Sequence, residues 1–194
     1  MKKVQLQGTL RKDLDKSATK SARKQGLVPA IFYGFQHENI ACYLPMIDIM
    51  PLLDTIEPHF IELTLEGKKY MCIINEVQYH PVSDIPLHVD LLHITDERTI
   101  RLDIPVIFTG EAPGILKGGE LAIKKRTIAV RALPKKMPQK LTVDISALDL
   151  GDKITVSAIE KGDYTVLAQP QIPLAVIMIP RALRSKAAES SEAV

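Results

Sequence analysis

The apolar stretches of this sequence are short, rich in Val, Ile, Thr, Phe and Tyr, and separated by Pro and Gly, and this pattern constrains the fold more than any other feature. Stretches of this length and composition are typical of strands, so we expect a mainly β protein. The expected strands lie near residues 3–10, 28–33, 40–44, 59–66, 69–79, 86–94, 98–109, 120–133, 140–146, 153–159, 164–169 and 174–179.

Two segments have helical features instead. Residues 15–25 predict a helix with Asp15 as its N-cap and Gly26 as its C-terminal stop, and residues 46–56 predict another, which Pro51 shortens or bends. After Ile94 the character of the chain changes, and the segment beyond it looks entirely β. We therefore expect three parts: an N-terminal domain over 1–94, an all-β C-terminal domain over 95–181 and a disordered tail over 182–194, which is small and polar.

Composition excludes several classes of protein. The chain has 194 residues, of which 46% are hydrophobic and 25% charged, as in a globular protein with a real core. Cys42 and Cys72 form no CxxC pair, so we expect no disulfide framework, no metal site and no cofactor, and a reducing cytosol. Because no window reaches the roughly 18 apolar residues that a membrane span needs, we also expect no membrane partner.

Charge is concentrated in blocks, although the formal net charge is only +2. Residues 1–24 hold eight basic and two acidic residues, and residues 117–140 hold eight basic residues against Glu120 alone. Between them, residues 25–93 hold nine acids against Lys68 and Lys69. The basic blocks therefore suggest surfaces that face an anionic partner, and the acidic excess is expected to face away from it.

The first basic block places its cations on one side of the expected helix. Lys16, Lys20 and Arg23 follow helical spacing, while Ala18 and Ala22 come out on the opposite side and let the helix lie close to a sheet. A solvated helix face would look similar. The near absence of Glu or Asp at helical spacing favours a binding surface over that alternative.

A second group of polar residues lies in NEVQYHPVSDIPLHVDLLHI, residues 75–94, which reads as a strand, a turn and a strand. Alternation places His88 and Asp90 on one face. A hydrolase built on this pair would also need a positioned nucleophile and a pocket, and no GxSxG motif occurs, so we expect no enzyme. Polar groups on a sheet surface instead suit the shallow minor groove of RNA. Tyr33 fits either a core aromatic or a base contact.

The order of these motifs resembles the bacterial large-subunit ribosomal protein twenty-five family, 5S rRNA-binding proteins that include the general stress protein Ctc. The resemblance rests on RKDLDKSATKSARKQG, LVPAIFYG, VQYHP and HVDLLHI. In the second half, GEAPGILKGGEL, ALPKKMPQKLTVDISALDLGD and the closing IPR are similar to the extra domain of the longer, Ctc-type members.

The resemblance implies a small N-terminal β-barrel with two short helices, bound to the loop E region of 5S rRNA in the large ribosomal subunit. Carried onto this sequence, Arg11, Lys16, Lys20 and Arg23 would hold phosphates, with Thr19 near the RNA. Closer polar contacts would come from Tyr33, Gln78, His88 and Asp90. Lys20 stands where the family commonly has Arg, which replaces a forked phosphate contact by a point charge. Ser17 and Leu91 also depart from the usual Gly and Phe.

Such a protein would be cytoplasmic and ribosome-associated, and its second domain would face other parts of the ribosome, including neighbouring proteins. The basic block at 117–140 fits a contact with rRNA, a contact with a neighbouring protein, or a solvated strand edge. A general RNA-binding stress protein or chaperone acting off the ribosome is the alternative function. It would use the same basic helix but show little preference between RNAs.

Overall fold

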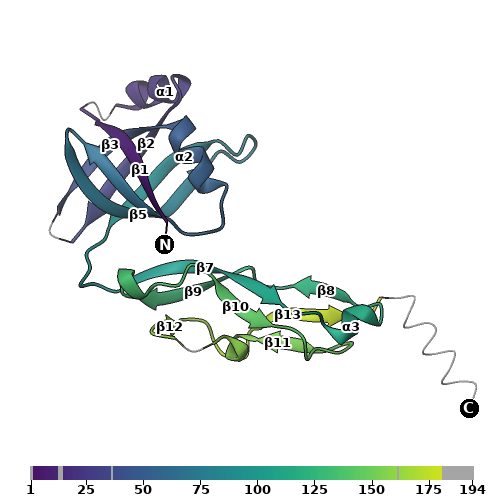
Figure 1. Ribbon diagram of the computed structural model, residues 1–194. Coiled ribbons are helices and arrows are strands. Elements are labelled where there is room, and N and C mark those ends of the chain that lie inside the picture. Colours follow the sequence, from purple (N-terminus) through teal and green to yellow (C-terminus); the bar gives the residue numbers. More distant parts are fainter. Residues whose placement is uncertain (1, 13–14, 36, 161, 181–194) are drawn as a thin grey trace, which may run out of the picture. The chain divides into compact units, whose positions relative to one another are not determined.

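The computed structural model describes residues 2–12, 15–35, 37–160 and 162–180, which form two compact units (Figure 1). Among the described residues, the first unit extends to Leu102 and includes Leu133–Met137, and the second comprises Asp103–Ala132 and the residues described between 138 and 180. The predicted boundary near residue 95 stays a prediction. The tail expected over 182–194 lies outside the described residues.

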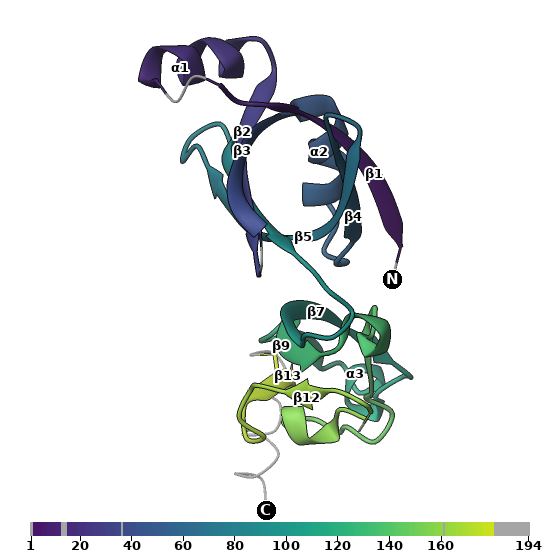
Figure 2. The same cartoon turned by 90° about the vertical axis from the view of Figure 1, so that its left-hand side faces the viewer.

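Six strands of the first unit close into a barrel in the order β1-β3-β2-β6-β5-β4 (Figure 2). Their bounds are Lys3–Leu10 for β1, Leu27–Gly34 for β2, His37–Pro45 for β3, Phe60–Leu65 for β4, Lys68–Tyr79 for β5 and Pro86–His93 for β6. Each strand lies within a few residues of its predicted range. The mainly β fold with an N-terminal barrel is therefore confirmed.

The barrel interior is apolar, and alternation along each strand decides which side chains reach it. Phe32 of β2 and both Val89 and Leu91 of β6 are fully buried in the barrel core. Because successive side chains of a strand point to opposite sides, burial of Val89 and Leu91 turns His88 and Asp90 outward. The core thus positions the polar groups that the sequence singles out.

The two predicted helices are present but shorter than expected. Helix α1 spans Lys16–Lys24 and ends before Gly26, whose φ of +76° is the left-handed conformation that stops a helix. Asp15 occupies the N-cap position, but its side chain makes no capping hydrogen bond. Helix α2 spans Met46–Leu53, contains Pro51 and places Ile49 in the barrel core, which closes one end of the ring seen in Figure 2.

The second unit contains a four-stranded sheet ordered β10-β7-β9-β12 and a three-stranded sheet ordered β11-β13-β8. The bounds are Ile100–Thr109 for β7, Glu120–Ile123 for β8, Thr127–Ala132 for β9, Leu141–Asp144 for β10, Lys153–Thr155 for β11, Thr165–Val166 for β12 and Pro173–Met178 for β13. Three short helical turns join them, namely α3 (Pro113–Leu116), η1 (Pro134–Lys136) and η2 (Val156–Ala158). η1 is among the residues grouped with the first unit.

The strand predicted over 120–133 is wrong as a single element. It divides into β8 and β9, which belong to different sheets, because Lys124 and Lys125 both direct their backbone N–H to the Leu174 carbonyl and interrupt the strand. The strand predicted over 153–159 likewise ends at Thr155 and continues as η2. Among the described residues, the helices are all too short or too polar to cross a bilayer.

Candidate nucleic-acid interface

Helix α1 presents cations to solvent and small side chains to the barrel. Ala22 is buried and the helix packs against β2, whereas Lys16, Lys20 and Lys24 are exposed. These three ammonium groups form no ion pair or hydrogen bond within the described part of the chain. Because none of the three is paired with an acid, the exposed side of α1 is a cationic strip.

Arg23 joins the end of α1 to the start of β6. Its Nε and one Nη donate to the carbonyl oxygen of Leu87, at 3.2 and 2.8 Å. The guanidinium has further N–H groups that take no part in these two bonds. Arg23 therefore combines its predicted position on the cationic strip with a structural role that the sequence did not indicate.

Arg11 has a similar structural role at the first turn of α1. Its Nη donates to the Thr19 hydroxyl, and its guanidinium lies 5.4 Å from the centre of the Tyr43 ring. Thr19 in turn donates to the backbone oxygen of Asp15 at 2.9 Å. Two arginines thus tether α1, while the lysines leave their charge available.

The outer face of β5 and β6 carries the predicted hydrogen-bonding groups. Nδ1 of His88 lies 2.7 Å from Oδ1 of Asp90, and both side chains are partly exposed. A carboxylate oxygen accepts, so Nδ1–H of His88 donates to Asp90 and Nε2 takes no part in this bond. Gln78 pairs with His88 across the strands, which places its exposed side chain on the same face.

Two further polar residues on this face were missed by the sequence analysis. Asn75 lies at a β-bulge of β5 and its Nδ2 donates to the hydroxyl of Tyr33 at 3.0 Å. Glu76 pairs with Asp90 and shares its face, so it is an exception to the expectation that the acids face away. Charge counted in blocks cannot show this, because alternate residues of one strand point in opposite directions.

Strand register brings these groups together along β6. The Arg23 guanidinium donates to the carbonyl of Leu87, the residue directly before His88. Tyr33 pairs with Leu92, which lies four residues beyond His88. At about 3.3 Å per residue, the polar groups occupy roughly 13 Å of strand. One end of this polar face therefore adjoins the end of the cationic strip.

Comparison with known proteins assigns both halves of the chain. Residues 6–91 match the model described as the Ribosomal L25p family, and residues 99–181 match that of the ribosomal protein TL5 C-terminal domain. A protein of Amoebophilus asiaticus named large ribosomal subunit protein bL25 is 43% identical over 190 residues, covering 98% of this chain and 96% of its own. This chain belongs to the Ribosomal L25p family.

Two further relatives match this chain over nearly their full length. Proteins named large ribosomal subunit protein bL25 from Cytophaga hutchinsonii and Porphyromonas gingivalis are 36% and 35% identical. These alignments cover 99% and 96% of this chain, and 100% and 98% of the relatives. The predicted family is confirmed. A ribosomal protein family is structural rather than enzymatic, which also confirms that the chain is not an enzyme.

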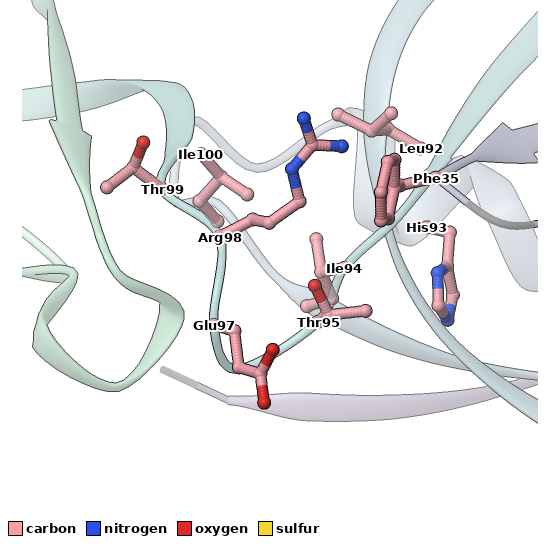
Figure 3. A pocket seen from close by; sticks show the side chains of 9 residues that line it. All are labelled: Phe35, Leu92, His93, Ile94, Thr95, Glu97, Arg98, Thr99 and Ile100. Carbon is pink, nitrogen blue, oxygen red and sulfur yellow. The ribbon is translucent and has the colours of Figure 1, made fainter.

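The geometry of this L25p member agrees with a binding role. His88 and Asp90 lie on the convex outer face of the barrel, whereas a hollow of about 420 Å³ is lined by other residues, among them Phe35, His93 and Arg98 (Figure 3). The Arg98 guanidinium stacks 4.2 Å from the centre of the Phe35 ring.

Over residues 2–12, 15–35, 37–160 and 162–180, no group of three His, Cys, Asp or Glu side chains could hold a metal ion.

Proposed function

We propose that this protein is a structural component of the large ribosomal subunit and joins it by binding 5S rRNA in the loop E region. The names of its relatives support a place in the large ribosomal subunit, and the resemblance of its motifs supports binding to 5S rRNA. One observation carries the proposal: Arg23 ties the cationic strip of α1 to the strand that presents His88 and Asp90. Such a protein works on the ribosome, in the bacterial cytoplasm.

The cationic strip supplies affinity. Lys16, Lys20, Arg11 and Arg23 contact phosphates and set the position of the protein on the RNA. If about four cations contact phosphates, log affinity falls by about 3 to 4 per tenfold increase in salt, taking the slope of roughly −0.9 per contact known for duplex DNA.

The polar face supplies selectivity. Asp90 fixes the imidazole of His88, so Nε2 meets a group that donates a hydrogen bond, such as a 2′-hydroxyl or a base amino group. Gln78 beside it both donates and accepts, and Tyr33, oriented by Asn75, reaches a neighbouring nucleotide. Groups held in this register discriminate between an irregular helix and a regular one, because only the irregular helix matches their spacing.

Binding to three RNAs tests the proposal: intact 5S rRNA, 5S rRNA whose loop E is replaced by a Watson–Crick duplex, and tRNA as competitor. We expect preference for intact 5S rRNA over both others. His88→Ala should reduce that preference by about 1–3 kcal/mol and leave binding to the duplex variant unchanged. Equal affinity for tRNA and intact 5S rRNA would contradict the proposal and favour the general RNA chaperone.

A further inference from the structure

The connection between β8 and β9 in the second unit carries three cations in succession, Lys124, Lys125 and Arg126. All three side chains are exposed and, over the residues that the structure describes, none has an ion-pair or hydrogen-bond partner. Four other lysines do pair with an acid, namely Lys2 with Glu57, Lys69 with Glu62, Lys117 with Asp149 and Lys135 with Asp96. The β8–β9 connection therefore holds three consecutive exposed cations, none of which has an acid within ion-pair distance among the described residues.

Main-chain hydrogen bonds fix this connection on both sides. The N–H groups of Lys124 and Lys125 donate to the carbonyl of Leu174, in β13, at 2.8 and 3.1 Å. The carbonyl of Arg126 accepts from the N–H of Val106, in β7, at 2.9 Å. Because the backbone is hydrogen-bonded to both sheets, the three Cα positions are held close together and the exposed side chains form a local concentration of positive charge.

We infer that the β8–β9 connection is a second phosphate-binding site for RNA, independent of α1. Residues 117–140 hold eight basic residues and Glu120 alone as an acid; Lys117 and Lys135 pair with acids from outside this block, whereas Lys124, Lys125 and Arg126 do not. An RNA backbone offers phosphates at short, regular intervals, which suits adjacent cations without a matching pocket. Lysine is depleted from the cores of protein–protein interfaces, so a protein partner fits this cluster less well.

The site is tested in the full-length chain with Lys16→Ala and Lys20→Ala already in place, so that the strip on α1 contributes little. The probe is a plain RNA duplex without loop E, titrated at several salt concentrations. Adding Lys124→Ala, Lys125→Ala and Arg126→Ala should lower the dependence of log affinity on log salt by about 3 and weaken binding at low salt at least tenfold. The alanines leave the main-chain hydrogen bonds of the connection in place.

A matched control removes three cations that are already paired, through Lys2→Ala, Lys69→Ala and Lys117→Ala. It changes the net charge equally, so it should shift the salt dependence by less than half as much. Equal effects of the two triple variants would overturn the inference, because net charge alone would then explain binding. Unchanged duplex affinity in the β8–β9 variant, with lost binding to an oligoglutamate peptide, would also overturn it and indicate an acidic protein partner.

This test is separate from that of the proposed function. If removing the β8–β9 cations lowers duplex binding but the protein shows no preference for intact 5S rRNA, the second site is supported. Only the role of loop E is then contradicted. A chain that keeps its preference for 5S rRNA and is unaffected by the β8–β9 alanines would contradict only the second site.

Discussion

The cationic strip of α1 and the β8–β9 connection carry comparable positive charge, but the strip is joined by a hydrogen bond to a strand that presents a fixed pair of polar side chains. In the barrel, Arg23 joins the strip to the strand of His88 and Asp90, and strand register sets their spacing. In the second unit, three cations occupy a short link between two small sheets. Charge alone attracts any RNA, whereas charge next to a registered polar face selects one shape.

Disrupting the barrel core would most reduce this difference between the cationic strip and the β8–β9 connection, because the core positions the polar groups beside the strip. Phe32 is fully buried, and its ring centre lies 5.0 Å from that of Tyr70. Phe32→Ala should lower the free energy of unfolding of the barrel by about 3–5 kcal/mol, because it leaves a cavity in the core. Ile47→Ala is the control, since Ile47 is 86% exposed, and urea unfolding measures both. A loss below about 1 kcal/mol in Phe32→Ala would contradict the described core.

Cys42 and Cys72 report the barrel separately from the second unit, because both thiols are buried inside it. Burial raises the pKa of each from 9.0 to about 12. The unfolded chain therefore loses these protons first, and stability is retained below about pH 9 and lost as the pH rises toward 12. At pH 10 the loss is about 1 kcal/mol for each thiol.

Alkylation at pH 8 should accordingly occur only as the barrel opens, and the loss at pH 10 should disappear in a chain with Cys42→Ala and Cys72→Ala. Rapid alkylation of the folded protein would show that the thiols are accessible. An alkaline destabilisation of equal size in the double alanine variant would assign it to other groups.

Arg23 is the link between charge and polar face, so its removal separates the two. Arg23→Ala should cost about 1.5–3 kcal/mol of stability, since it removes charged hydrogen bonds to the Leu87 carbonyl, and should weaken 5S rRNA binding. Arg23→Lys restores the charge without the fork, so stability should stay low while the salt dependence recovers. Lys24→Ala, at an exposed neighbour that makes no such hydrogen bond, is the control for the change in stability. Full recovery of stability in Arg23→Lys would exclude the tether.

The carboxylates opposite one another on the polar face sharpen the comparison further. Asp90→Asn removes the anion that orients His88 and should reduce the preference for intact 5S rRNA about tenfold. Glu76→Gln removes an equal charge from the paired position without contacting His88, so it should leave the preference unchanged and strengthen binding slightly. Binding curves for intact 5S rRNA and the duplex variant, measured in parallel on both protein variants, distinguish the two effects. Identical behaviour of the two variants would mean that Asp90 acts only through its charge.

Local pattern predicted most of the barrel and part of its surface. Alternation and the Pro and Gly positions are local signals, so the six strands and the shared face of His88 and Asp90 followed from them. The contact of Arg23 with Leu87 did not, because it joins residues 64 positions apart. The division of 120–133 also depends on distant partners, since β8 and β9 pair in different sheets.

A hydroxyl-radical footprint of the full-length protein on 5S rRNA measures most directly whether the strip and the polar face act on one RNA site. We predict a single protected stretch at loop E, which fades in a chain with Lys16→Ala and Lys20→Ala and becomes less distinct from background in His88→Ala. Protection spread evenly along the RNA, or confined to a regular helix and unaffected by His88→Ala, would contradict joint recognition by the two surfaces.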